Sequence, residues 1–76
     1  MRKLPKEIEN LNRGELELLI EKWVILRRNS ERNRSILKRS WFDGIGYERI
    51  AEEYNLSVTQ VKEIIYKSEE QIFKHL

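Results

Sequence analysis

The feature that most constrains this chain is a helical pattern, a very short break and a helix-capping signal that follow one another near the C-terminus. Residues Tyr47–Tyr54 have the apolar spacing of a short helix with Ile50 and Ala51 on its inner face. Asn55 comes next, a residue that tolerates the left-handed backbone conformation at a helix end. The stretch 57–60, Ser-Val-Thr-Gln, is a capping box whose first and last side chains satisfy each other's backbone amides. The pattern predicts two helices joined by a tight turn.

Two helices that follow each other so closely cross steeply, and the crossing needs a small residue where they touch. Ala51 is that residue, with apolar side chains on both sides of it: Ile50 and Leu56 before the second helix, and Val61 within it. Segment Tyr47–Leu76 is therefore predicted to be a helix-turn-helix. Its second helix is expected to bury Val58, Val61, Ile64, Ile65, Ser68, Ile72 and Leu76.

The first turns of this second helix carry hydrogen-bonding side chains on their outer side. The exposed front is expected to consist of Val58, Thr59, Gln60, Lys62, Glu63, Tyr66 and Lys67. In DNA-binding helix-turn-helix proteins the corresponding turns contact base edges, and Thr, Gln, Lys and Glu can each hydrogen-bond bases or phosphates. The alternative is a purely structural helical hairpin, which would share the capping box and the apolar period.

The rest of the chain is also predicted to be helical, because strand signals are absent and short breaks separate the periodic stretches. Residues 1–14 are expected to form a partly flexible arm with a short turn near 6–11. A helix over 15–28 follows, and another runs from Glu31 to about Phe42 with Ser30 as its N-cap, unless one helix continues through Asn29. We predict an all-α fold: a small helical bundle of about four helices, forming one domain over 15–76 with the helix-turn-helix part in 30–76.

The helix predicted over 15–28 carries more apolar side chains than one face can bury. Leu18, Val24 and Ile25 lie off its main stripe, so either a second helix covers them or they form a homodimer surface. A homodimer would present two recognition helices to a two-fold DNA site. Trp23 and Trp41 are expected, from their helical phase, to anchor the core.

Charge is unevenly distributed along the chain. The net charge is only +2 although 37% of the residues are charged, which is weak support for phosphate neutralisation. Segment 27–39 holds six basic residues against Glu31, whereas segment 50–76 has more acidic than basic residues. The basic residues are Arg27, Arg28, Arg32, Arg34, Lys38 and Arg39. This cluster is either a solvated helix face or a surface for DNA phosphates.

The stretch ILKRSWFDGIGYERIAEEYNLSVTQVKEIIYKSEEQIF resembles region 4 of bacterial sigma factors. It is also similar to small transcriptional regulators of phages and mobile elements that share this module. The shared pattern is an Ile-Leu helix ending in an aromatic residue, then Asp-Gly, then Tyr-Glu-x-Ile-Ala-Glu, then Leu-Ser-x-x-x-Val-Lys. The resemblance covers about residues 30–76.

The resemblance implies that the last helix, about 58–74, enters the major groove of DNA. The positions that would then face DNA are Val58, Thr59, Lys62, Glu63, Tyr66 and Lys67, with backbone contacts from Ser57, Tyr47, Lys38 and Arg39. The chain departs from the pattern in having Glu63, Glu69 and Glu70 where such helices are richer in Arg. It also shows no sign of the sigma regions that bind core polymerase, so a free-standing regulator is expected rather than a complete sigma factor.

These observations together predict a sequence-specific DNA-binding protein, a transcriptional regulator of a phage or mobile genetic element. The alternatives are a protein-interaction module that binds RNA polymerase or a regulator, and a small DNA-packaging recognition subunit. No catalytic, metal or cofactor site is expected, because the chain has no cysteine and its single histidine is His75. We expect His75 to interact with the last carbonyls of its helix or with solvent. No apolar run is long enough for a membrane span or a signal peptide, so a cytoplasmic location is expected.

Overall fold

The computed structural model describes residues 6–25 and 28–75, which form helices joined by short loops and include no strand. The helices are α1 (Lys6–Glu9), α2 (Arg13–Trp23), α3 (Ser30–Trp41), α4 (Tyr47–Tyr54) and α5 (Val58–Phe73). Since α1 is a single turn, the predicted all-α bundle of about four helices is confirmed.

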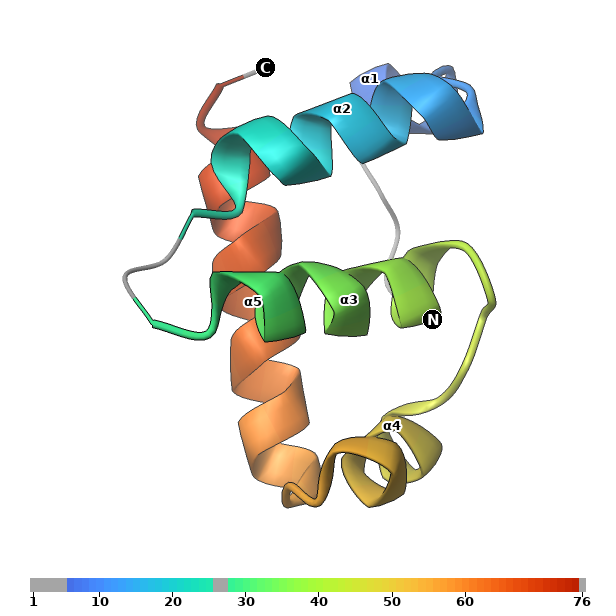
Figure 1. The fold of residues 1–76 in the computed structure, drawn as a ribbon. Coiled ribbons are helices and arrows are strands. Elements are labelled where there is room, and N and C mark those ends of the chain that lie inside the picture. Colours follow the sequence, from blue (N-terminus) through green and yellow to red (C-terminus); the bar gives the residue numbers. More distant parts are fainter. Residues whose placement is uncertain (1–5, 26–27, 76) are drawn as a thin grey trace.

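Helix α5 is the spine of the bundle, and α2, α3 and α4 all pack against it (Figure 1). Along this spine α3 lies between α2 and α4 and contacts both of them. The core along α5 is formed by the fully or nearly fully buried side chains Ile8, Ile20, Val24, Ile36, Leu37, Ile50, Ala51, Val61, Ile65 and Ile72. Because every element contributes at least one of these residues, the core is continuous from α1 to α4.

The N-terminal part contains the short turn predicted near 6–11, and the structure adds that this turn packs on the core. Residues 1–5 of the predicted arm lie outside the described residues, but α1 is helical and buries Ile8 in the core. Helix α2 begins at Arg13 rather than at residue 15, because Asn12 forms a capping box with Glu15. The Asn12 side chain accepts a hydrogen bond from the Glu15 amide at 2.9 Å, and the Glu15 carboxylate accepts one from the Asn12 amide.

The predicted helix over 15–28 ends early, and this changes the interpretation of its apolar surplus. Helix α2 ends at Trp23, and Val24 has a non-helical backbone conformation. The break turns the Val24 side chain into the core, where none of it is exposed. The prediction that Val24 lines a homodimer surface is therefore wrong. Leu18 and Ile25 are 71% and 63% exposed and are the remaining members of the predicted surface.

The break before α3 is confirmed, but its cap differs from the prediction. Asn29 adopts the left-handed conformation at the N-cap position without a side-chain capping bond, and Ser30 is already the first helical residue. A helix running continuously through Asn29 is therefore excluded.

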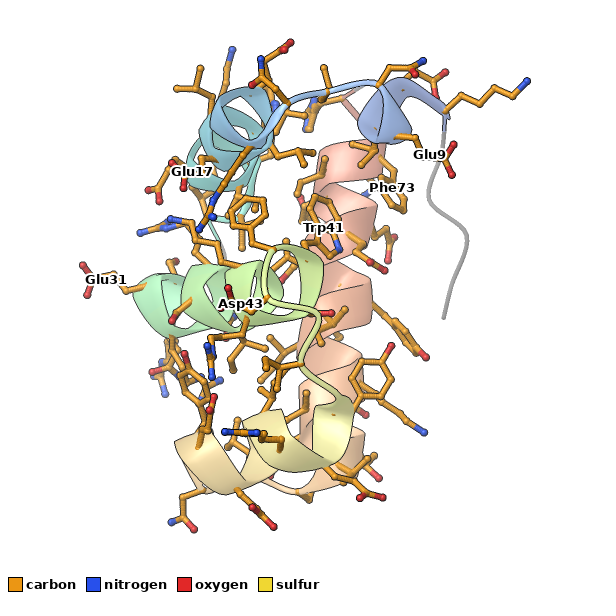
Figure 2. All side chains as sticks on the ribbon, turned by 90° about the vertical axis from the view of Figure 1, so that its right-hand side faces the viewer. Glu9, Glu17, Glu31, Trp41, Asp43 and Phe73 are labelled. Carbon is orange, nitrogen blue, oxygen red and sulfur yellow. The ribbon has the colours of Figure 1, made fainter. Side chains whose placement is uncertain are left out.

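The two tryptophans pack against the core, as predicted, but both remain half-buried and each has a specific partner. Trp23 stacks on His75, with ring centroids 3.5 Å apart and an interplanar angle of 9°. The Trp41 side chain is directed toward α5 (Figure 2), where its Nε1–H donates to Glu69 at 3.0 Å. His75 is exposed and its backbone amide donates to the Ile72 carbonyl, both as predicted, but the stacking of its ring on Trp23 was not predicted.

Candidate nucleic-acid interface

Helices α4 and α5 cross steeply at the lower end of the bundle. In Figure 1 α4 is seen nearly along its axis while α5 stands upright, and after the quarter turn of Figure 2 α4 lies across the foot of α5. Ala51 is 5% exposed at this crossing, with Ile50 and Val61 fully buried beside it. The small residue and its apolar flanks were predicted from the sequence, and the structure confirms them.

The turn between the two helices has the predicted backbone geometry. Asn55 occupies the left-handed region with φ of 55° and ends α4. The backbone amide of Leu56 donates to the Ala51 carbonyl at 2.8 Å, which satisfies one of the last acceptors of α4. Leu56 is half-buried against the core. These bonds fix the direction in which the chain enters α5.

The predicted capping box at the start of α5 is formed in both directions. The Ser57 hydroxyl accepts from the Gln60 amide at 3.1 Å, and the Gln60 side-chain Oε1 accepts from the Ser57 amide at 2.9 Å. Both residues are exposed. Their side chains therefore stabilise the start of α5, and the side-chain Oε1 of Gln60 already accepts a hydrogen bond in the free protein.

The other predicted DNA-facing residues of α5 lie on its solvent side. Thr59, Lys62, Glu63, Tyr66 and Lys67 are exposed, while Val58 is half-buried against the core. We call the outer side of 58–67 the α5 front. Its charged groups are two ammonium groups and one carboxylate, and the structure gives Lys67 no ion pair or ring contact within the described residues.

Tyr47, the first residue of α4, joins the α5 front through its ring. The Tyr47 and Tyr66 rings meet edge to face, with centroids 6.5 Å apart and an interplanar angle of 87°. The Lys62 ammonium lies 5.8 Å from the centroid of the Tyr47 ring, within the range of a cation–π contact. The structure thus brings Tyr47 together with two of the predicted α5 residues.

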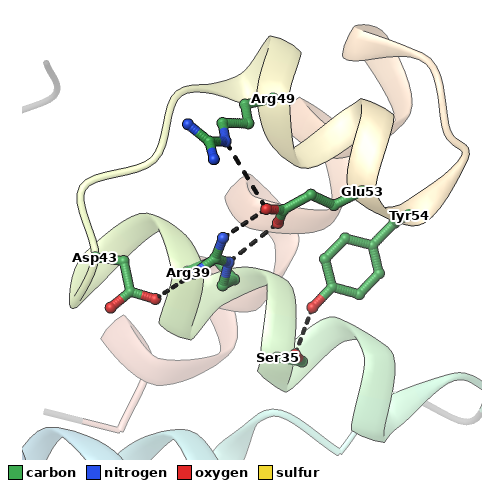
Figure 3. A network of polar contacts seen from close by, with 6 residues as sticks. All are labelled: Ser35, Arg39, Asp43, Arg49, Glu53 and Tyr54. Atoms are coloured by element: carbon green, nitrogen blue, oxygen red, sulfur yellow. Dashed lines mark hydrogen bonds and ion pairs between the residues drawn. The ribbon is translucent and has the colours of Figure 1, made fainter.

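Lys38 and Arg39, predicted to contact the DNA backbone, are bound to carboxylates of neighbouring elements. Lys38 Nζ lies 2.8 Å from Glu21 Oε1 on α2. The Arg39 guanidinium binds Glu53 of α4 with two hydrogen bonds and Asp43 with a third at 2.8 Å (Figure 3). Their contact with DNA stays a prediction, and it would compete with these ion pairs.

The pKa values reflect these contacts. The hydrogen bonds from Arg39 lower the pKa of Glu53 and, in return, raise the pKa of Arg39. The hydrogen bond from Lys38 is the largest cause of the lowered pKa of Glu21, against a partly opposing desolvation. Each carboxylate is therefore held ionised, and the positive charge of its partner is balanced within the fold.

One further residue of the basic cluster, Arg34, also joins helices. Arg34 donates to the Val24 carbonyl at 2.9 Å and pairs with Glu21 at 3.4 Å, which links α3 to the end of α2. Arg32 donates to the side-chain oxygen of the buried Asn33. On the α4 side, the Ser35 and Tyr54 hydroxyls share a hydrogen bond of 2.5 Å (Figure 3). The cluster is thus neither a purely solvated face nor an open cationic surface.

Glu69 is a polar residue whose position sequence reasoning missed. It is only 4% exposed and accepts the Trp41 hydrogen bond, although an adjacent Glu-Glu pair normally indicates a solvated helix face. The neighbouring Glu70 is exposed. No local pattern identifies the buried member of the pair, because its partner lies 28 residues away in sequence.

The chain was compared with protein-family models, with curated proteins and with solved structures, and none of them matches it. Among the described residues, no three His, Cys, Asp or Glu side chains gather in a way that could hold a metal ion. None of the described helices combines the length and the apolar character that crossing a membrane requires.

Proposed function

We propose that the protein binds double-stranded DNA sequence-specifically, with the α5 front lying in the major groove. The observation that carries this proposal is the start of α5. It projects from a steep, tightly packed crossing, is capped by its own side chains and presents a polar face to solvent. A helix end held in this way can present several side chains to base edges without losing its own stability.

The more specific role rests on the resemblance to sigma region 4. On that ground we propose a transcriptional regulator of a phage or mobile genetic element, acting on promoter DNA and able to contact RNA polymerase. The α3–α4–α5 arrangement fits this role because α3 supports the helix pair through Arg39 and Ser35, which bond Glu53 and Tyr54 of α4. A DNA-packaging recognition subunit would use the same helix pair, and the target sequence would distinguish the two roles.

The direct test is a fluorescence anisotropy titration of the purified protein against the DNA upstream of its own gene and against a random duplex. We expect Lys62→Ala and Lys67→Ala to weaken binding without a change in melting temperature, since both side chains are exposed. A lost base contact costs roughly 1–3 kcal/mol, while a lost phosphate contact lowers the salt slope by about one.

Lys74→Ala is the matched control, because Lys74 is an exposed lysine immediately after α5, beyond the proposed contact region. It should leave the affinity unchanged. If the wild-type protein shows no binding to the upstream DNA above random duplex at low salt, the proposal is wrong. Unchanged affinity in both front variants would mean that another face of the protein contacts the DNA.

A protein-interaction module is the second candidate, favoured by a different observation. Leu18 of α2 and Ile25, two residues after the end of that helix, are large exposed apolar side chains, and α2 lies at the opposite end of α5 from α4 (Figure 1). The ion pairs of Lys38 and Arg39 also balance part of the positive charge on α3. Sedimentation together with a pull-down of RNA polymerase separates the two. A monomer that retains polymerase but binds no DNA would favour the interaction module.

A further inference from the structure

The side chain of Lys62 is held by an aromatic contact that the other lysine of the α5 front lacks. Its ammonium lies 5.8 Å from the Tyr47 ring centroid, and Tyr66 meets the same ring edge to face. Tyr66 is also one helical turn after Lys62 on α5. The three side chains form what we call the Tyr47 clamp. It spans α4 and α5 at the edge of the α5 front.

The Tyr47 clamp restricts the directions in which the Lys62 ammonium can donate hydrogen bonds to DNA. A lysine ammonium is a point charge on a long flexible chain, so an unrestrained lysine contributes attraction without a defined direction. An ammonium near an aromatic face loses part of this freedom before binding, and less rotamer entropy is lost when it forms a hydrogen bond. The edge-to-face contact with Tyr66 restrains the Tyr47 ring in turn.

The side-chain amide of Gln60, which also lies on the α5 front, is less able than Lys62 to contact a base. Recognition of adenine by glutamine uses both the side-chain oxygen and the side-chain nitrogen. In this structure Gln60 Oε1 already accepts the Ser57 amide at 2.9 Å. Breaking that bond would remove half of the capping box, so Gln60 is better suited to maintaining the helix end than to reading adenine.

We propose that Tyr47 is a positioning residue that directs the Lys62 ammonium to the O6 and N7 acceptors of a guanine in the major groove. The proposal rests on the proposed function and deepens it. Guanine is the base that presents two acceptors on its major-groove edge, which suits a donor without acceptors. The preferred DNA site should therefore contain one G·C pair whose recognition depends on both Lys62 and Tyr47.

The test is a selection of bound duplexes from a random-sequence DNA pool, made with the wild type and with Lys62→Ala, Tyr47→Leu and Tyr47→Phe. The wild type should enrich guanine at one position, and Lys62→Ala should lose this preference. Tyr47→Leu should reduce it about two- to fivefold, as expected for loss of one exposed cation–π contact. Tyr47→Phe should retain it, because the ring remains.

Two controls separate positioning from stability. Tyr54→Leu removes the other α4 tyrosine, which bonds Ser35 on α3, and should lower the melting temperature without changing the guanine preference. Replacing the selected guanine by 7-deazaguanine removes the N7 acceptor. This change should weaken wild-type binding and leave binding by Lys62→Ala unchanged.

NMR of the free wild-type protein gives a readout that needs no folded Tyr47→Leu variant. The ε-methylene protons of Lys62 should be shifted upfield by the Tyr47 ring relative to those of Lys67. A guanine preference that survives Lys62→Ala, one that is undiminished in Tyr47→Leu, or equal shifts for the two lysines overturns this inference and leaves DNA binding intact. If the wild type binds no duplex, the proposed function fails, and the inference fails with it.

Discussion

The α4–α5 crossing makes a quantitative prediction for Ala51→Leu. Ala51 is 5% exposed in a core that also contains the fully buried Ile50 and Val61, so we expect the three added carbon atoms of leucine to overpack it. Overpacking of this kind costs about 1–3 kcal/mol of unfolding free energy. A domain of 76 residues has an unfolding entropy near 160 cal/mol/K, so each kcal/mol corresponds to about 6 °C. The melting temperature should fall by about 6–19 °C.

The assay is thermal unfolding followed by circular dichroism at 222 nm, a wavelength that reports helix content. Glu52→Leu is the matched control: it introduces the same side chain at the next position of α4, where the residue is exposed. Surface substitutions usually change stability by less than about 0.5 kcal/mol, so this variant should melt within about 3 °C of the wild type. If Ala51→Leu melts as the control does, the two helices do not touch at this residue and the crossing geometry is wrong.

Three further changes probe the contacts that hold the bundle. Trp41→Phe keeps an aromatic ring, although a smaller one, and removes the hydrogen bond to the buried Glu69. We expect the unfolding free energy measured in urea to fall by about 1–3 kcal/mol, and wild-type stability would mean that this bond contributes nothing. Ser57→Ala removes the hydroxyl that accepts a hydrogen bond from the Gln60 backbone amide, so the unfolding free energy should fall by about 0.5–2 kcal/mol. Ser57→Asp should keep wild-type stability, because its carboxylate can accept the same bond. Arg39 lowers the pKa of Glu53, so the ion pair's contribution to stability is present above the ordinary pKa of 4.5 and is lost as the pH falls through the lowered pKa. Glu53→Gln should therefore flatten this part of the pH dependence of stability, measured by urea unfolding between about pH 6 and pH 3. An unchanged curve would contradict the assignment to Glu53.

The C-terminal part of the fold was predictable because its signals are local. A capping box, a left-handed Asn55 and a small Ala51 at fixed spacing each act within a few residues of themselves, and all three are found as expected. The start of α2 depends on the same kind of signal. The Asn-x-x-Glu pattern beginning at Asn12 has capping-box spacing, so the correct boundary was present in the sequence but went unrecognised.

The wrong predictions concern side chains whose partners are distant in sequence, or residues that lie beyond the end of the helix to which they were assigned. Val24 was assigned to a surface by continuing the α2 helix past Trp23, but the phase argument no longer applies once the helix ends. The buried position of Glu69 depends on Trp41, which is far away in sequence. Neither effect can be obtained from spacing alone, because tertiary contacts decide both.

In the basic cluster, contacts with residues distant in sequence reduce the positive charge that is available to bind DNA. Counted along the sequence, segment 27–39 is strongly positive, but in the fold Lys38 and Arg39 are paired with carboxylates of α2, of α4 and of the loop after α3. Within the described residues the α5 front itself offers only Lys62 and Lys67 as cations. Local charge density in the sequence therefore overstates the charge available for DNA.

The salt dependence of DNA binding measures this difference directly. The logarithm of the binding constant falls with the logarithm of salt concentration with a slope of about −0.9 for each phosphate neutralised. If Lys67 neutralises a phosphate while Lys62 contacts guanine, the slope should be about −0.9, and if Lys38 and Arg39 leave their ion pairs to bind phosphates as well, it should be about −2.7. We expect the smaller slope, because breaking the Arg39 contacts would also remove two hydrogen bonds that join α3 to α4. A slope of about −2.7 that returns to about −0.9 in the Lys38→Ala, Arg39→Ala double variant would show that DNA displaces the carboxylates, and that Lys38 and Arg39 form a phosphate-binding surface held closed in the free protein.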